Sequence, residues 1–370
     1  MQLVKASRDA LLKPLQVVSG IVERRQTLPI LANILLRKEG DRVSFTATDL
    51  EIQIQTSASI SAGGETAATT IAARKLVDIL RALPDADVQL SLTNKKMAVA
   101  SGKSRFNLQT LAAEEFPTVA QADFTADFSL PAATLKYLLN MVHFAMAQQD
   151  IRYYLNGMLL VVDGATVRAV ATDGHRLALA EVTNAEAASG KAGKIEAIVP
   201  RKTILELGRL LPDTDDPVRV QMAANQAKFS FGDIELISKL VEGKFPDYQR
   251  VVPAANSKIF AINREDLMHA LQRAAILTTD KFKGVRMLLG TGSLKINSTN
   301  ADQEDAQEEL EIGYEGEPLD IGFNVNYLLD VLANLKNDEV SFSLGDALGS
   351  ALITMPNSDK FKYVVMPMRI

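Results

Sequence analysis

The sequence contains no cysteine, and this absence removes several kinds of site. No disulfide, thiolate metal site, iron–sulfur cluster or cysteine nucleophile is possible. A cysteine-free chain also suits a reducing compartment. Histidine is nearly absent, because only His143, His175 and His269 occur and they are scattered along the chain. We therefore expect no metal site and no other cofactor.

Long apolar runs are missing as well. No stretch approaches 18 consecutive apolar residues, the length that a membrane-spanning helix needs. The first 16 residues lack the apolar segment of a signal peptide. We therefore expect a cytoplasmic protein without a membrane partner. The chain has 370 residues, 47% hydrophobic and 23% charged, which is an ordinary globular composition for two or three domains.

A threefold internal repeat is present instead. Thr48-Asp49 recurs as Thr172-Asp173 and again as Thr299-Asn300, at similar spacing. Three helical stretches that end in a helix-stopping signal recur at the same spacing. Each is followed by a strand in which apolar and polar residues alternate. The helical stretches are 73–85, 200–213 and 324–338, and the strands are 87–92, 218–222 and 339–344. The repeat predicts three domains, 1–122, 123–251 and 252–370.

Each repeat is predicted to run strand, helix, several strands, second helix and further strands. The opening helices are expected near 7–24, 131–147 and 264–279. Pro14 should kink the first of these or delay its start, and Asn263 can cap the third. The fold class is therefore α+β, with two helices packed on antiparallel sheet in each of three tandem domains.

Positive charge is concentrated in the helices. The six helical segments carry a net charge of +7, so the remaining residues must carry −12 to give the net charge of −5. The most basic pairs in the later helices are Arg74-Lys75 and Arg201-Lys202. Because equivalent helices of a repeat face alike, this pattern favours one surface that meets a polyanion such as duplex DNA, without reading its sequence. Ordinary solvated helix faces are the alternative.

Signals for catalysis are weak. Asp173 and His175 could form an acid–base pair, but Asp173-Gly174 is also a hairpin signal, and Asp49 stands at the matching place with no histidine nearby. Three hypotheses about function remain open on the residues alone. The first is a non-enzymatic DNA clamp, the second is a static DNA-binding protein, and the third is an enzyme built around Asp173 and His175.

Several phrases resemble one family closely. They are Gln148–Asp150 with Ile151–Met158, Thr172–Leu177 (TDGHRL), Ser238–Val241, Phe245–Tyr248 (FPDY), Gly322–Val325 and Val364–Arg369 (VVMPMR). They extend along the chain, which resembles the bacterial DNA polymerase III β subunits, the replicative sliding clamps. The resemblance implies a DNA-clamp fold in which two chains join head to tail into a closed ring around DNA. It also implies a processivity factor without catalytic residues.

The resemblance implies three sets of site residues. At the family's DNA-contact positions stand Gln149, Tyr153 and Tyr154, and also Arg25 or the adjacent Arg24. The basic helix residues are added to these. The DNA set is Arg24, Arg25, Arg74, Lys75, Gln149, Tyr153, Tyr154, Arg201 and Lys202. For the dimer, apolar residues and lysines or arginines of domain one should meet apolar and acidic residues of domain three. The dimer set is Lys75, Lys96, Lys103, Arg105, Phe106, Leu108, Ile276, Leu277, Glu304 and Glu308.

The third implied set is a pocket between the second and third domains. It should bind short apolar peptides of the polymerase III catalytic subunit, the clamp loader, other polymerases and mismatch-repair proteins. Leu348 departs from the smaller aliphatic residue expected, and Ile370 stands where leucine is usual. The pocket set is Leu155, Thr172, Gly174, His175, Arg176, Leu177, Pro246, Arg250, Val251, Asn324, Tyr327, Leu348, Val364, Met366, Pro367, Met368 and Arg369.

Overall fold

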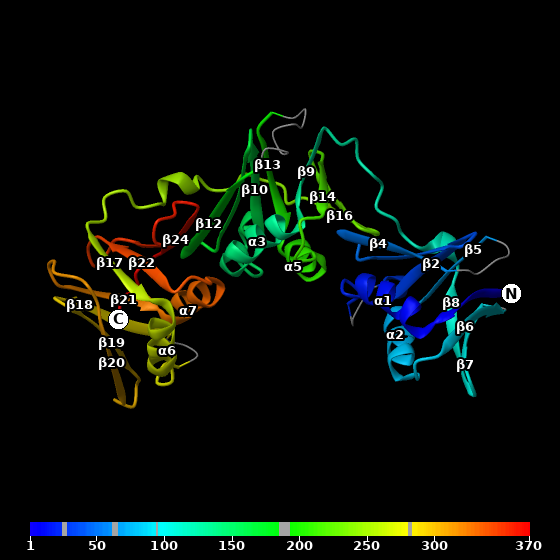
Figure 1. Cartoon of the computed structure of the whole chain (residues 1–370), viewed down its shortest axis with the longest axis horizontal. Coiled ribbons are helices and arrows are strands. Elements are labelled where there is room, and N and C mark those ends of the chain that lie inside the picture. Colours follow the sequence, from blue (N-terminus) through cyan, green and yellow to red (C-terminus); the bar gives the residue numbers. More distant parts are fainter. Residues whose placement is uncertain (24–27, 61–65, 94, 185–192, 280–282) are drawn as a thin grey trace. The chain divides into compact units, whose positions relative to one another are not determined.

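The structure is a computed structural model that describes residues 1–23, 28–60, 66–93, 95–184, 193–279 and 283–370 (Figure 1). The first third of the chain runs strand, helix, four strands, helix, three strands. Its elements are β1 (Gln2–Ser7), α1 (Arg8–Ser19), β2 (Asn33–Glu39), β3 (Arg42–Thr48), β4 (Ile52–Ser59), β5 (Ala67–Ala72), α2 (Ala73–Ala82), β6 (Asp87–Thr93), β7 (Lys96–Ser101) and β8 (Ser104–Leu111).

The other two thirds repeat this order, which confirms the predicted repeat. The second holds β9 (Ala126–Pro131), α3 (Ala132–Val142), β10 (Gly157–Asp163), β11 (Thr166–Thr172), β12 (Arg176–Thr183), β13 (Ile195–Pro200), α5 (Arg201–Leu210), β14 (Pro217–Met222), β15 (Gln226–Phe231) and β16 (Ile234–Lys239). The third holds β17 (Lys258–Asn263), α6 (Arg264–Ala275), β18 (Gly284–Gly290), β19 (Ser293–Thr299), β20 (Asp305–Glu311), β21 (Leu319–Asn324), α7 (Val325–Asn334), β22 (Glu339–Leu344), β23 (Ala351–Thr354) and β24 (Phe361–Val365).

Local chemistry explains where the opening helices begin. The Ser7 side chain accepts from the N–H of Ala10 and caps α1. The helix therefore starts at Arg8, before Pro14, so the expected delay of its start is wrong. As predicted, the Asn263 side chain caps α6 by accepting from the N–H of Asp266 at 3.0 Å.

The opening helices also end earlier than predicted. They end at Ser19, Val142 and Ala275, because the chain then tightens into shorter turns. After α6, the N–H of Ile276 bonds the carbonyl oxygen of Arg273, three residues back. No helix in the described part of the chain is long and apolar enough to cross a membrane.

The described residues fall into two compact units, each with its own sheets. One unit contains a twelve-stranded sheet in the order β1-β6-β7-β8-β5-β2-β3-β4-β16-β15-β14-β9. The other contains an eight-stranded sheet, β13-β10-β11-β12-β24-β23-β22-β17, and a four-stranded sheet, β20-β19-β18-β21. All of the pairings within these sheets are antiparallel, as expected, and they join successive repeats at β4–β16 and β12–β24.

The core lies between these sheets and their helices. In the first unit α1 packs against α2 and across β3 and β4, and in the second α6 packs against α7 and across β19 and β20 (Figure 1). The largest buried side chains include Phe45 and Phe229 in the first unit, and Phe323, Phe342 and Tyr363 in the second. Burial of these apolar faces, rather than helix propensity, holds the short helices in place.

Candidate functional site

A tight turn between β11 and β12 forms one wall of the candidate site. The Thr172 hydroxyl donates to the carbonyl of Arg176 at 2.6 Å and accepts from the N–H of Gly174. The Asp173 carboxylate accepts from the N–H groups of His175 and Arg176. Gly174 has a φ of 91°, a left-handed conformation that glycine adopts without strain. The interpretation of Asp173-Gly174 as a hairpin turn is confirmed, and its carboxylate holds the turn.

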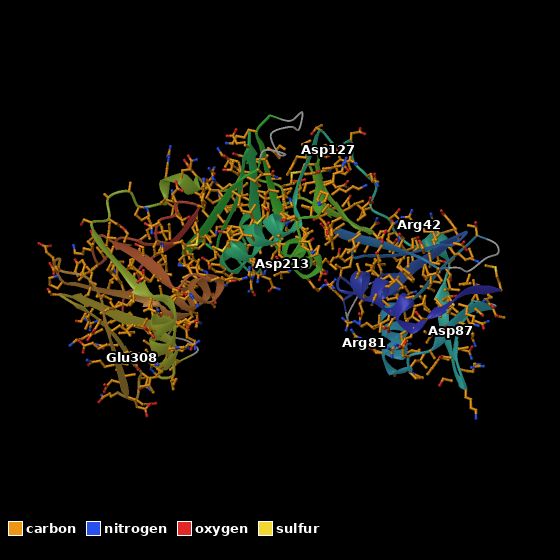
Figure 2. The ribbon with its side chains drawn as sticks, viewed as in Figure 1. Arg42, Arg81, Asp87, Asp127, Asp213 and Glu308 are labelled. Atoms are coloured by element: carbon orange, nitrogen blue, oxygen red, sulfur yellow. The ribbon has the colours of Figure 1, made fainter. Side chains whose placement is uncertain are left out.

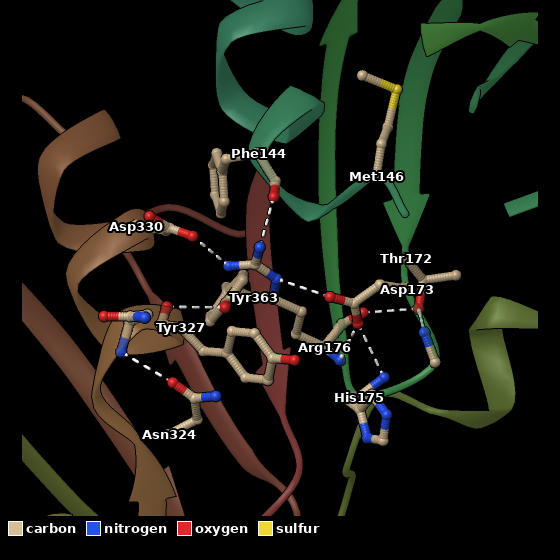
Figure 3. A network of polar contacts seen from close by, with 12 residues as sticks. Phe144, Met146, Thr172, Asp173, His175, Arg176, Asn324, Tyr327, Asp330 and Tyr363 are labelled. Atoms are coloured by element: carbon tan, nitrogen blue, oxygen red, sulfur yellow. Dashed lines mark hydrogen bonds and ion pairs between the residues drawn. The ribbon is translucent and has the colours of Figure 1, made fainter. Parts of the chain in front are cut away.

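Arg176 leaves this turn and joins the second repeat to the third (Figure 3). Its guanidinium pairs with Asp173 at 3.1 Å and with Asp330 on α7 at 2.6 Å. It also donates to the carbonyl oxygen of Phe144 at 2.7 Å. The ring of Tyr327 lies under the guanidinium, 4.4 Å from its carbon to the ring centroid. Arg176 is thus held by two ion pairs, a carbonyl and an aromatic face.

Burial determines the electrostatics of this cluster. The Arg176 side chain is only 10% exposed. Burial opposes its charge, but Tyr363 and Asp330 outweigh that effect, and the pKa of Arg176 is raised. For Tyr363, in contrast, burial raises the pKa, and its hydroxyl donates to the carbonyl of Tyr327 at 2.8 Å. The guanidinium therefore stays charged at any physiological pH and acts as a fixed cross-link.

Beside Arg176 lies a largely apolar hollow with a volume of about 430 Å³. It is lined by the turn, by the end of β24 and by the segment around Pro246. Ten residues of the predicted pocket set meet here. They are Leu155, Thr172, Gly174, His175, Arg176, Leu177, Pro246, Val251, Val364 and Met366.

A second hollow, of about 500 Å³, lies along the C-terminal segment. Met366 lines both hollows, so the two adjoin at its side chain. Five residues of the pocket set line the second hollow: Leu348, Met366, Pro367, Met368 and Arg369. The C-terminal segment is held on both sides, because Met366 N–H bonds the carbonyl of His175 and Met368 N–H bonds that of Gly322.

Three predicted pocket residues line neither hollow. Asn324 caps α7 by accepting from the N–H of Asn326. Tyr327 supports Arg176 from below. Arg250 is exposed and pairs with Asp247 at 2.9 Å. Tyr327 therefore contributes through Arg176 rather than through the wall of a hollow.

Other lining residues were missed as pocket residues. Arg152, Tyr248 and Ser350 line the first hollow, as does Tyr154, which the sequence assigned to DNA. Tyr248 ends the FPDY phrase and Arg152 lies in the phrase Ile151–Met158, so both phrases carried the signal. No local pattern marks Ser350, because β23 and β24 bring it near the turn.

The predicted DNA residues lie in different surroundings. Arg24 and Arg25 are outside the described residues. Gln149 is exposed, and Tyr153 is exposed and meets Tyr154 edge to face at 6.0 Å. Arg74 and Lys75 are exposed on α2, and Arg74 donates to the carbonyl of Val22. Arg201 is half-buried and donates to the carbonyls of His143 and Met146, and Lys202 is also partly buried.

The predicted dimer residues lie in the first and third repeats, and Lys75 is the one on α2. Lys96 begins β7, Lys103 follows it, and Arg105, Phe106 and Leu108 lie on β8, mostly exposed. Ile276 and Leu277 follow α6, where Ile276 is 75% exposed. Glu304 precedes β20, and Glu308 on β20 pairs with Arg273 of α6 at 2.5 Å (Figure 2). This pair lowers the pKa of Glu308.

Comparisons with known proteins match the whole chain. Three family models apply in order: the DNA polymerase III beta subunit N-terminal domain over residues 1–120, the central domain over 129–247 and the C-terminal domain over 249–369. The beta sliding clamps of Pseudomonas aeruginosa and Escherichia coli K12 are 46% and 44% identical to the chain, over 98% of each protein.

Solved structures agree with these matches. The DNA polymerase III subunit beta of Pseudomonas aeruginosa superposes with a TM-score of 0.95 at 45% identity, covering all of both chains. A sliding clamp of that organism bound to griselimycin superposes at 0.94, also at 45% identity and over all of both chains. The superpositions cover the residues of all three repeats and of both hollows.

Proposed function

Because this chain belongs to the DNA polymerase III beta subunit family, and so is a sliding clamp rather than a catalytic enzyme, we propose that two copies close head to tail around duplex DNA. The ring tethers the replicative polymerase to its template. The three clamp domains are 1–122, 123–251 and 252–370. Replication of DNA places this activity in the cytoplasm.

Open sheet edges carry this proposal. Within the chain, β4 pairs with the last strand of the next repeat, β16, and β12 pairs with β24 in the same way. The equivalent strand of the third repeat is β20, which within the described residues pairs only with β19. The strand equivalent to β16 and β24 in the first repeat is β8, and in the described part of the chain its residues 104–109 pair only with β7. The remaining partner for β20 is therefore β8 of a second copy.

The internal pairings also predict the register of this interface. Leu236 faces Ile54 at the first junction, and Tyr363 faces Ala178 at the second. The same register sets Phe106 opposite Ala306 of the second copy. Phe106 and Leu108 then approach Ile276 and Leu277, and Lys75, Lys96, Lys103 and Arg105 lie near the acidic side that includes Glu304 and Glu308. The interface thereby joins an apolar centre to opposite charges.

Weak contacts suit a ring that moves along DNA. Exposed Arg74, Lys75 and Gln149 can meet phosphates without reading bases, and salt screens such contacts strongly. Tyr153, four residues after Gln149 in the sequence, presents an exposed ring. We assign DNA contact to the set Arg24, Arg25, Arg74, Lys75, Gln149, Tyr153, Tyr154, Arg201 and Lys202. The ring holds DNA by topology, so these contacts need little affinity.

The two adjoining hollows are proposed to bind partner peptides. The first is apolar and has the size of a short peptide segment. Met366, shared by both hollows, is a flexible side chain that adapts to different partners. The partners are the polymerase III catalytic subunit, the clamp loader, other polymerases and mismatch-repair proteins. All seventeen residues of the pocket set stay assigned to this site.

Retention on DNA tests the proposal. The protein is loaded with a clamp loader and ATP onto nicked circular plasmid, which is then cut once. Stable retention before the cut and release after it are expected from topological linkage. Retention after the cut, lost only at raised salt, would instead identify a static DNA-binding protein and overturn the clamp mechanism.

A further inference from the structure

An arginine side chain of the second repeat bonds the first repeat at the junction between them. Arg209 on α5 donates to the carbonyls of Gln16 and Val17, in the last turn of α1, with the shorter distance 2.8 Å. The same guanidinium pairs with Glu206 at 2.7 Å. It lies directly against Gly20, where an added Cβ would be 2.5 Å from Nη2 of Arg209. The last carbonyls of a helix lack partners within it, and a cation there is favourable.

The junction between the second and third repeats uses the same arrangement with a different arginine. Asp330 is the sixth residue of α7, as Glu206 is of α5. Counted from the first residue of α3, Phe144 is the thirteenth residue. Gly20 is likewise the thirteenth residue counted from the first residue of α1. Arg176 joins these two positions, because it pairs with Asp330 and donates to the carbonyl of Phe144. Both internal junctions thus place a guanidinium, paired with the sixth residue of a second helix, at the C-terminal end of an opening helix or in the 3-10 turn that directly follows it.

The junction between two copies has the corresponding residues. On α2 the sixth and ninth residues are Asp78 and Arg81, matching Glu206 and Arg209. Asp78 and Arg81 are exposed, and neither side chain has a hydrogen bond or ion pair within the described part of the chain. Figure 2 labels Arg81. The matching carbonyls belong to Gln272 and Arg273 in the last turn of α6, beside exposed Ile276.

We propose that Arg81, paired with Asp78, caps the C-terminal end of α6 of a second copy. The guanidinium donates to the carbonyls of Gln272 and Arg273 there, as Arg209 does to Gln16 and Val17 within the chain. The nearby positive charge of Arg273 is already neutralised by Glu308. The inference rests on the proposed ring, and it adds a specific helix-end contact to the strand pairing of the interface.

The dimer dissociation constant tests the contact. Arg81→Ala should raise it about tenfold or more, because each interface loses a charge-assisted hydrogen bond. Arg42→Ala is the matched control, since Arg42 is also an exposed arginine of the first repeat (Figure 2), and among the described residues its side chain bonds only Ser57 on the neighbouring strand. It should change the constant less than about twofold. Sedimentation of the full chain over a dilution series gives all three values.

Two outcomes separate this inference from the ring itself. If the unchanged protein dimerises and Arg81→Ala dimerises equally tightly, the cap is wrong while the ring stands. If the unchanged protein is a monomer throughout the dilution series, the ring fails and the cap with it. An equal loss for Arg42→Ala would mean a general charge effect and would also overturn the cap.

Cross-linking tests the geometry independently. Because the chain has no cysteine, Asp78→Cys with Ile276→Cys gives two defined thiols. A short thiol-specific cross-linker should convert the protein at high concentration to covalent dimer, since Gly20 contacts Glu206 at the equivalent place. Arg42→Cys with Ile276→Cys should give none. No cross-link from the first pair, in a sample shown to be dimeric, would overturn the proposal.

Discussion

The turns at Thr48–Ile52 and Thr172–Arg176 have the same hydrogen bonds and different roles. In each, the threonine hydroxyl donates to the carbonyl four residues on and accepts from an N–H two residues on. In each, the aspartate accepts from the N–H groups two and three residues on. One scaffold has therefore been kept in two repeats.

The side chains on the scaffold make the difference. Ile52 fills the core at 1% exposure, whereas Arg176 at the same position joins two repeats. Leu50 adopts a φ of 79°, while Gly174 at its counterpart leaves room for Arg152. The comparison teaches that the turn fixes where its side chains lie. The third and fifth residues then decide whether those side chains pack into the core or line a hollow.

The largest effect should come from removing the fifth residue. Arg176→Ala removes the guanidinium that bonds Asp173, Asp330 and the Phe144 carbonyl. We expect a loss of about 3 kcal/mol in the free energy of unfolding, at the low end for a buried pair because Asp330 is 44% exposed. Binding of a fluorescent peptide from the polymerase should be lost as well. Ile52→Ala should lose about 3 kcal/mol by opening a cavity, with peptide binding kept. Urea unfolding and fluorescence anisotropy check both variants.

Removing the aspartate that each turn has as its second residue should lower the free energy of unfolding by a smaller amount. Asp49→Ala and Asp173→Ala each leave two N–H groups without an acceptor, at a cost of about 1–2 kcal/mol. Asp173→Ala also removes a partner of Arg176, which lines the first hollow. Only that variant should weaken peptide binding. Equal peptide binding by the two variants would contradict the distinction between the two turns.

Substituting the third residue of each turn should change the free energy of unfolding in opposite directions. Leu50→Gly relieves a left-handed backbone and should stabilise the protein by up to about 1 kcal/mol. Gly174→Ala should destabilise it by a similar amount, because its Cβ would lie 2.9 Å from Nη1 of Arg152. It should also shift the first hollow and weaken peptide binding. Thermal denaturation measures both, and the same sign for both would refute the assignment.

The smallest effect concerns pH. Hydrogen bonds from Arg152 lower the pKa of Asp150 to about 2, and Arg152 also bonds the carbonyl of Asp173. A carboxyl with a lowered pKa stabilises the fold above its usual pKa of about 3.9. That contribution is lost as pH falls through about 2. Carbon-13 NMR should show this midpoint, and Arg152→Ala should return it toward 3.9.

The repeat made most of the fold predictable. Landmarks such as Thr48-Asp49 and Thr172-Asp173 gave the element order, and the caps at Ser7 and Asn263 follow from local chemistry. The Arg176 network was not predictable, because its partner Asp330 is 154 residues away. Nothing in a helix sequence tells which carboxylate meets a distant guanidinium. Tyr154 shows the same limit, since its phrase was recognised but its place in the first hollow depends on tertiary packing.

The pairing of β12 with β24 has a mechanical consequence. A partner anchored beside Val364 and Met366 pulls on the end of β24. Five consecutive residues of β12 pair with that strand, from Arg176 to Ala180. Force along the strand loads these backbone bonds together in shear, since they run perpendicular to it. With a polymerase bound at the proposed peptide site, β24 would therefore also transmit tension into the neighbouring repeat.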